Sequence, residues 1–168
     1  MQKINSLHGI WQRNAAFFLS ALLVLTADQL SKLWTRSNLA TGESLPETGF
    51  FRLTHVHNTG AAFGLFQDQT SLLTFVAFIG IAVLLVFALF MYRRLPFLNN
   101  MPGKMSLGLV LGGTVGNLID RLSSGYVTDF IDIGIWPAFN IADSAITVGV
   151  FIFAYSLLRS LGRERKTT

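Results

Sequence analysis

Residues 69–92 read QTSLLTFVAFIGIAVLLVFALFMY, a run of 24 residues with no charge between Asp68 and Arg93. A bilayer core is about 30 Å thick, and roughly 20 helical residues cross it. The run therefore predicts a transmembrane helix. Three more apolar runs predict further spans at about 14–34, 104–121 and 141–159.

The composition places the chain in the class of membrane proteins. Hydrophobic residues make up 51% of the 168 residues and charged residues 13%, about half of the usual charged share. The mean hydropathy is +0.50. The net charge of +4 is modest, and the basic residues lie at the ends of apolar runs, so we expect no nucleic-acid partner. The predicted fold is an all-α membrane protein, one domain over residues 1–168 with four transmembrane helices.

The distribution of Lys and Arg predicts the orientation. With the N-terminus in the cytoplasm, the inner segments carry nine of these residues: Lys3, Arg13, Arg93, Arg94, Lys104, Arg159, Arg163, Arg165 and Lys166. The outer segments carry Lys32, Arg36, Arg52 and Arg121. No small-residue cleavage site follows the first apolar run, so we expect it to be a retained span. Both termini are then cytoplasmic.

The outer segment 36–68, between the first two spans, is polar. Phe51, Leu53, His55 and His57 alternate with other residues, which is typical of a strand. We expect a small β-rich segment on the outer membrane surface.

Four apolar runs end at aspartates, and the topology places all four at the outer face: Asp28, Asp120, Asp129 and Asp143. A carboxylate at the end of a transmembrane helix is costly, so such a group suggests a functional site. Two adjacent carboxyl groups in a low-dielectric layer cannot both ionise easily, and one keeps a proton. Aspartic proteases use this arrangement. The chain has no cysteine, which excludes thiolate catalysis and disulfides.

Each motif also has a simpler structural interpretation. Gly108, Gly112 and Gly116 are four residues apart, which favours a close helix contact, although a glycine face also leaves room for a substrate segment. Asp28 and Lys32 are spaced as a helical ion pair. Asn117 is spaced to share a surface with Asp120 and Arg121, which could be only an interfacial ion pair.

Asn140 and Asp143 have the spacing of a helix N-cap and its first-turn acid. Capping does not explain the second aspartate, Asp129, on the connection to the same helix end. His55 and His57 lack an acidic partner at metal-ligand spacing, so we expect no metal site.

Together these strings resemble the lipoprotein signal peptidase (signal peptidase II) family of bacteria. The resemblance covers 28–32, 58–63, 112–121, 127–130 and 139–144 in matching order. It implies a membrane aspartic endopeptidase that removes the signal peptide from a diacylglyceryl-modified prolipoprotein, just before the lipidated cysteine. It implies no cofactor, contact with membrane lipid, and a site at the outer face of the bacterial cytoplasmic membrane. We expect a monomer, although the sequence does not determine the oligomeric state.

The resemblance also implies roles for individual residues. The catalytic pair is Asp129 and Asp143, separated by residues 130–142, a span that predicts a tight connection. Supporting roles in orienting the pair and the substrate fall to Asp28, Lys32, Asn58, Gly60, Asn117, Asp120, Arg121, Asn140 and Ala142. The residues alone do not decide whether Asp120 or Asp129 is the partner of Asp143.

Two other classes of protein use similar features. A proton-coupled carrier would use the same acids, but nearer the midplane and with access from both sides. A non-catalytic membrane scaffold would not need a second aspartate beside Asp143.

Overall fold

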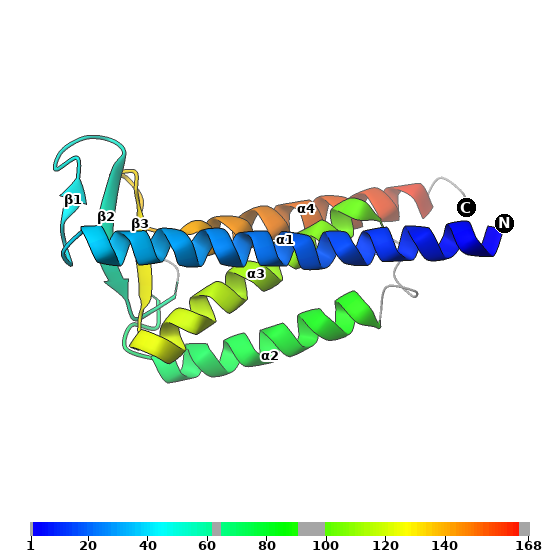
Figure 1. Cartoon of the computed structure of the whole chain (residues 1–168), viewed down its shortest axis with the longest axis horizontal. Helices are drawn as coiled ribbons and strands as arrows, with labels where there is room; N and C mark the ends of the chain where they lie inside the picture. Colours follow the sequence, from blue (N-terminus) through cyan, green and yellow to red (C-terminus); the bar gives the residue numbers. More distant parts are fainter. Residues whose placement is uncertain (1, 62–64, 91–99, 165–168) are drawn as a thin grey trace.

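The computed structural model describes residues 2–61, 65–90 and 100–164, and four helices form its framework (Figure 1). These are α1 (Gln2–Asn38), α2 (Thr70–Leu89), α3 (Met101–Ser124) and α4 (Ile141–Glu164). Each predicted span falls on one of them. The last two residues of the second predicted span, 91 and 92, lie outside the described residues. So do Ala62 and Phe63 of the family strings, and the basic residues Arg93, Arg94, Arg165 and Lys166.

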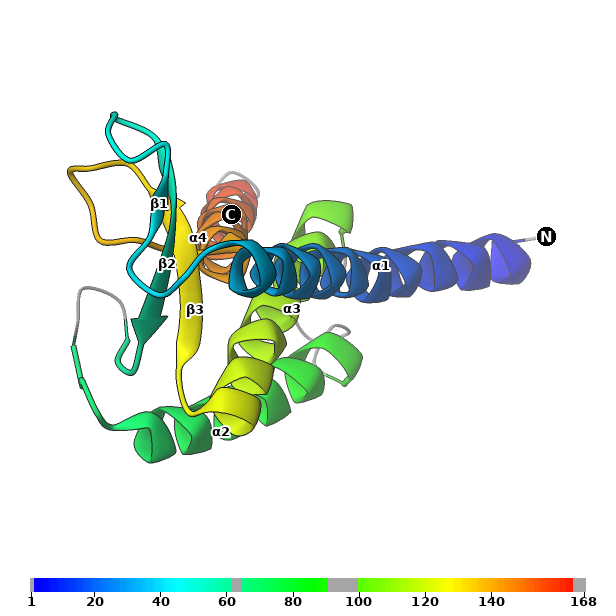
Figure 2. The same cartoon turned by 60° about the vertical axis from the view of Figure 1, so that its left-hand side comes forward.

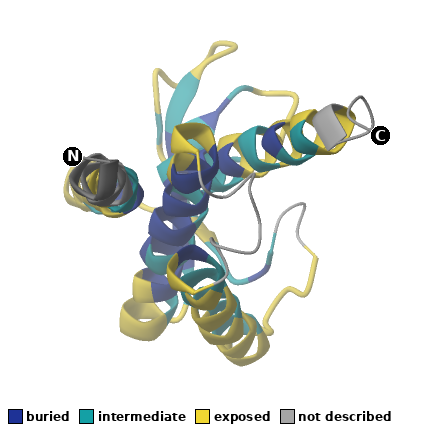
Figure 3. Cartoon of the chain, turned by 90° about the vertical axis from the view of Figure 1, so that its right-hand side faces the viewer, coloured by how far each residue is buried: buried dark blue, intermediate teal, exposed yellow. Residues whose placement is uncertain are grey.

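Helix α3 occupies the centre of the bundle and contacts the other three helices (Figures 1 and 3). Its start is set by Asn100, whose side chain accepts a hydrogen bond from the Gly103 amide at 2.7 Å. Its end is set by Gly125, which adopts φ +80°, a conformation that glycine reaches without steric cost. Half of the residues of α3 are buried, including Lys104, Asn117 and Asp120.

The glycine stripe of α3 is a helix-packing surface. A Cβ atom on Gly112 would lie 2.5 Å from the carbonyl oxygen of Ala21 in α1, and one on Gly108 would collide with Phe17. On the opposite side, a Cβ atom on Gly113 would lie 2.5 Å from the carbonyl oxygen of Ala142 in α4. The close helix contact is therefore confirmed. The space above the stripe is filled by α1, so the idea that it leaves room for a substrate segment is wrong.

Three of the helices are long and apolar enough to cross a membrane: Trp11–Asn38, Thr70–Leu89 and Ile141–Gly162. Helix α2 has Ala88 as its one buried residue, as expected of a helix whose apolar surface faces lipid. Helix α3 is long enough as well, but its buried polar side chains lower its hydropathy. Those side chains are turned toward other helices, where they find partners.

A three-stranded antiparallel sheet lies across one end of the bundle (Figure 2). Its strands are β1 (Ser44–Leu45), β2 (Arg52–Asn58) and β3 (Val127–Asp132), in that order. Strands β1 and β2 confirm the small sheet expected in segment 36–68. Asp129 lies on the connection to α4 as expected, and residues 127–132 of that connection form the third strand, which was not predicted. The pairing places Val56 opposite Asp129.

The connection from β3 to α4 runs from Ile133 to Asn140. Phe139 pairs with Ile131 as an isolated bridge, so the chain turns back over residues 132–138 and enters α4 at Ile141. Outside this turn, the Arg52 guanidinium holds Asp132 at 2.5 Å. The result is a short path that sets Asp129 and the start of α4 side by side.

Candidate active site

The four aspartates lie at the end of the bundle that carries the sheet. Asp28 comes from α1, Asp120 from α3, Asp129 from β3 and Asp143 from α4. Each of the four carboxylates accepts a hydrogen bond from a residue outside its own helix or strand. The predicted convergence of the aspartates is therefore present.

Lys32 is the hub of a buried ion network between α1 and α3. Its ammonium group lies 2.8 Å from Asp28 and 3.2 Å from Asp120, and all three side chains are fully buried. It also donates to the amide oxygen of Asn117 at 2.9 Å. A lysine has three N–H donors, so these three acceptors use all of them. The predicted pairing of Asp28 with Lys32 is confirmed.

Asp120 pairs with cations of α1 and not with its neighbour in sequence. The Arg36 guanidinium donates to Asp120 at 2.6 Å, and the amide of Thr128 donates to its other oxygen at 3.0 Å. Arg121 instead donates to the carbonyl of Gly60 at 3.0 Å. We expected Asn117, Asp120 and Arg121 to share one hydrogen-bonded surface. This expectation is wrong for Arg121.

Arg36 and Thr128 belong to the network but are absent from the sequence-based site. Arg36 donates through its Nε atom to the Thr128 hydroxyl at 2.8 Å, which links α1 to β3. A signal for Arg36 was present, since Asp28, Lys32 and Arg36 are each four residues apart and share one helix face. For Thr128 we find no such signal.

Asn140 joins Asp129 to Asp143. Its side-chain amide donates to Asp129 at 2.7 Å. Its side-chain oxygen accepts from the Asp143 amide at 2.9 Å, and its own backbone amide donates to the Asp143 carboxylate at 3.2 Å. The N-cap interpretation of this pair is confirmed, and the same residue also contacts the second carboxylate.

Each of the two carboxylates has one further amide donor. Asn58 of β2 donates to Asp129 at 2.8 Å, and Asn117 of α3 donates to Asp143 at 2.8 Å. Burial raises the pKa of Asp129 to about 7, and the charge of Asp143 adds to this effect. A carboxyl group with such a pKa can hold a proton near neutral pH.

The remaining supporting residues hold the surroundings in place. The Ala142 amide donates to Asp28 at 3.0 Å, which fixes the first turn of α4 against α1. The Gly60 amide donates to the side chain of Asn58 at 2.9 Å and so orients a donor to Asp129. A Cβ atom at Gly60 would lie 2.7 Å from the carbonyl of Leu65.

Asp129 and Asp143 both line a cavity of about 910 Å³. Its wall includes residues of β2, β3, the β3–α4 connection and the first turns of α4, where Val148 is half exposed on the helix surface. The lining therefore combines the two carboxylates with apolar side chains of α4, Ile146 and Val148.

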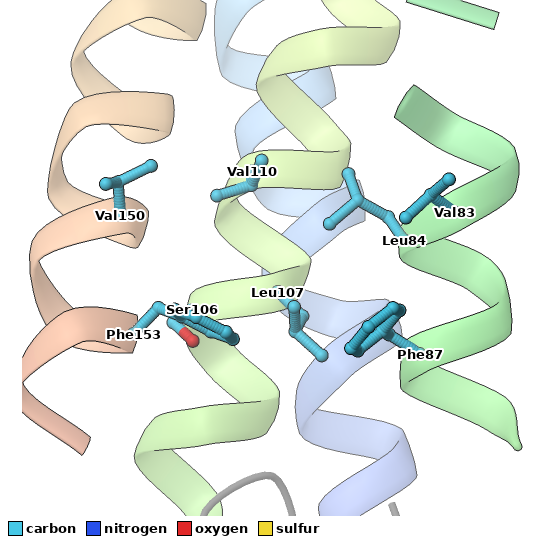
Figure 4. Close-up of a pocket in the computed structure, with 8 residues that line it drawn as sticks. All are labelled: Val83, Leu84, Phe87, Ser106, Leu107, Val110, Val150 and Phe153. Atoms are coloured by element: carbon cyan, nitrogen blue, oxygen red, sulfur yellow. The ribbon is translucent and has the colours of Figure 1, made fainter. Parts of the chain in front are cut away.

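A second cavity, of about 250 Å³, lies deeper between α2, α3 and α4 (Figure 4). It is lined by Val83, Leu84, Phe87, Ser106, Leu107, Val110, Val150 and Phe153. None of these side chains can ionise, so we do not assign acid–base chemistry to it.

The two strand histidines have structural contacts. His55 donates through Nδ1 to the carbonyl of Leu39 at 2.9 Å. The ring of His57 stacks on Tyr126 with centroids 3.7 Å apart. In the described ranges, no three histidine or acidic side chains are grouped so that they could hold a metal ion.

A family model described as signal peptidase (SPase) II matches residues 20–159. The chain belongs to the signal peptidase II family. A lipoprotein signal peptidase of Dehalococcoides mccartyi is 54% identical over 138 residues, which are 82% of this chain and 86% of that protein. One of Moorella thermoacetica is 51% identical over 150 residues, 88% of this chain and 96% of that protein.

A solved structure described as a bacterial membrane enzyme is similar in fold to this signal peptidase II. The TM-score is 0.79 at 30% identity, and the match covers 88% of this chain and 90% of the other. A second structure with the same description gives a TM-score of 0.73 at 31% identity, over 84% of this chain and 92% of the other. The protein is thus a bacterial membrane peptidase of the signal peptidase II type.

Proposed function

We propose that this signal peptidase II cleaves prolipoproteins with Asp129 and Asp143 as its catalytic pair, just before a cysteine that carries a diacylglyceryl group. The observation that carries the proposal is that both carboxylates line one cavity and are joined by Asn140. The raised pKa of Asp129 supports a proton shared by the pair.

The reaction is a hydrolysis that needs no cofactor. One carboxylate takes a proton from water, and the water oxygen bonds to the scissile carbonyl carbon. The other carboxyl group gives its proton to the carbonyl oxygen. The diol then collapses: the first carboxyl group gives its proton to the leaving nitrogen, the C–N bond breaks, and the second carboxyl group regains its proton.

The other site residues orient the pair. Asn58, Asn117 and Asn140 donate to the carboxylates. Gly60 donates to Asn58, Arg121 donates to Gly60, and Ala142 fixes the first turn of α4 against Asp28. Asp28, Lys32 and Asp120 tie α1 and α3 together beneath them.

The cavity suits a substrate that lies in the membrane. A signal peptide is an apolar helix whose cleavage point lies near the outer face. The apolar side of the cavity beside Val148 offers an approach from the bilayer, in which the diacylglyceryl chains would remain. The proton-coupled carrier is less favoured, because the aspartates gather at one end of the bundle.

We further propose four membrane crossings with both termini in the cytoplasm and the aspartates at the outer face. The nine-to-four distribution of Lys and Arg supports this orientation. Reporter fusions after Arg94 and at the C-terminus should report the cytoplasm, and fusions at Glu47 and Ser124 the outside. A cytoplasmic signal at Ser124 would contradict the shared outer site.

A cleavage assay tests the activity. Purified enzyme in proteoliposomes should cut a diacylglyceryl-modified prolipoprotein and leave a product that begins with the lipidated cysteine. The unmodified precursor is the matched control and should remain uncut. Metal chelators should leave the rate unchanged. Cleavage that is lost on chelation and restored by zinc would overturn the aspartic mechanism.

A further inference from the structure

The two carboxylates of the proposed pair have unequal surroundings. Asp143 lies in the first turn of α4, where the helix dipole favours a negative charge. Asp129 lies within a strand that has no comparable dipole. This inequality suggests that the shared proton has a preferred place.

Asn117 connects Asp143 to a buried cation. Its amide oxygen accepts from Lys32 at 2.9 Å, while its amide nitrogen donates to Asp143 at 2.8 Å. Hydrogen bonds in a chain polarise one another, and the effect is largest where water is excluded. The positive charge of Lys32 thus strengthens the bond that Asn117 donates to Asp143.

The side chains that donate to Asp129 do not themselves accept a hydrogen bond from any cation that the structure describes. Asn58 and Asn140 each donate to Asp129, but their own side-chain oxygens accept from backbone amides, those of Gly60 and Asp143. These amides are neutral, so they polarise the donors less. Burial and the charge of Asp143 raise the pKa of Asp129 to about 7.

The other charged groups near the pair lie on α3, α1 and β2. On α3, Arg121 lines the same cavity as the two carboxylates and donates to the carbonyl of Gly60. The negative charges of Asp28 and Asp120 are neutralised by Lys32 and Arg36 of α1. On β2, His57 also lines the cavity.

We propose that Lys32, acting through Asn117, keeps Asp143 as the ionised member of the pair, while Asp129 holds the shared proton. Asp143 is then the base that takes a proton from water and later returns it to the leaving nitrogen. Asp129 gives its proton to the scissile carbonyl oxygen and regains it when the diol collapses. Lys32 and Asn117 are positioning residues. The assignment rests on the proposed function, since it presupposes the pair.

The test compares the pH dependence of kcat in three proteins: wild type, Asn117→Ala and Asn58→Ala. The wild type should give a bell-shaped profile whose limits belong to the coupled pair. Asn117→Ala removes a donor to the ionised Asp143, so the acid limb should move up by about one pH unit while the alkaline limb stays. In this variant Lys32 keeps its ion pairs with Asp28 and Asp120.

Asn58→Ala is the matched control, because it removes an equivalent amide donor from the other carboxyl group. Ionisation of Asp129 becomes less favourable, so the alkaline limb should move up while the acid limb stays. The reverse pattern, or no shift of the acid limb in Asn117→Ala, would overturn the assignment. A wild type that fails to cleave would instead overturn the proposed function.

Infrared spectroscopy gives a second test, which does not depend on whether Asn117→Ala and Asn58→Ala fold. Near pH 6, the wild type should show the carbonyl band of a protonated carboxyl group. Asp129→Asn should remove this band, and Asp143→Asn should retain it. A band that survives in Asp129→Asn and disappears in Asp143→Asn would place the proton on Asp143 and overturn the assignment.

Discussion

Asp129→Asn and Asp143→Asn are each expected to insert, fold and bind lipidated substrate, but to lose cleavage by several orders of magnitude. Asparagine keeps the size of aspartate and much of its hydrogen bonding. It cannot share or transfer the proton, and loss of a general acid or base costs about 10²–10⁴-fold for that term alone. The rate of cleavage by purified, folded variants measures the effect.

The matched control for this prediction is Asp132→Asn. Asp132 lies on the same strand as Asp129 but pairs with Arg52 at 2.5 Å on the far side of the turn, outside the cavity lining. Cleavage should stay near the wild-type rate. The assignment of the pair is wrong if folded Asp129→Asn cleaves normally while folded Asp120→Asn is inert, because Asp120 would then be the partner of Asp143.

Lys32→Met is expected to cause the largest loss of stability. The substitution keeps the length of the side chain but removes its charge. Among the described residues, Asp28 then has no cationic partner, and Arg36 is the one cationic partner left to Asp120, although both carboxylates are fully buried. Breaking a buried ion pair by removing one partner costs about 3–5 kcal/mol. The yield of folded protein after extraction in mild detergent, and its thermal unfolding, measure the loss.

The double variant Lys32→Met/Asp28→Asn is the control for charge. It removes the charge of Asp28, the carboxylate that Lys32→Met leaves without a cation, so part of the lost stability should return. If Lys32→Met alone were as stable as the wild type, the buried network would not be what joins α1 to α3. Asp120→Asn should also lower stability, through Lys32 and Arg36 and not through Arg121 as its sequence position suggests.

The family strings and local spacings predicted much of the candidate site. The strings named Asp129 and Asp143, and spacing identified Asp28 with Lys32 and the Asn140 cap. Such pairs lie three or four residues apart, a distance that helix geometry turns into contact. Arg36 has the same spacing from Lys32. This spacing was a signal that Arg36 belongs to the same helix face, but it does not show that the partner of Arg36 is Asp120 on another helix.

By itself, the sequence determined the four helices, the end of the bundle where the aspartates gather, and the packing role of the glycine stripe. Each follows from local chemistry: uncharged runs of helical length, polar residues at their ends, and small residues at four-residue spacing. The tertiary structure alone decided that residues 127–132 form a strand, that Asp120 pairs with Lys32 and Arg36, and that Asn117 links Lys32 to Asp143. These contacts join residues far apart in the chain, so they depend on which faces of the helices meet. The close approach of α1 to the glycines of α3 decides which faces these are.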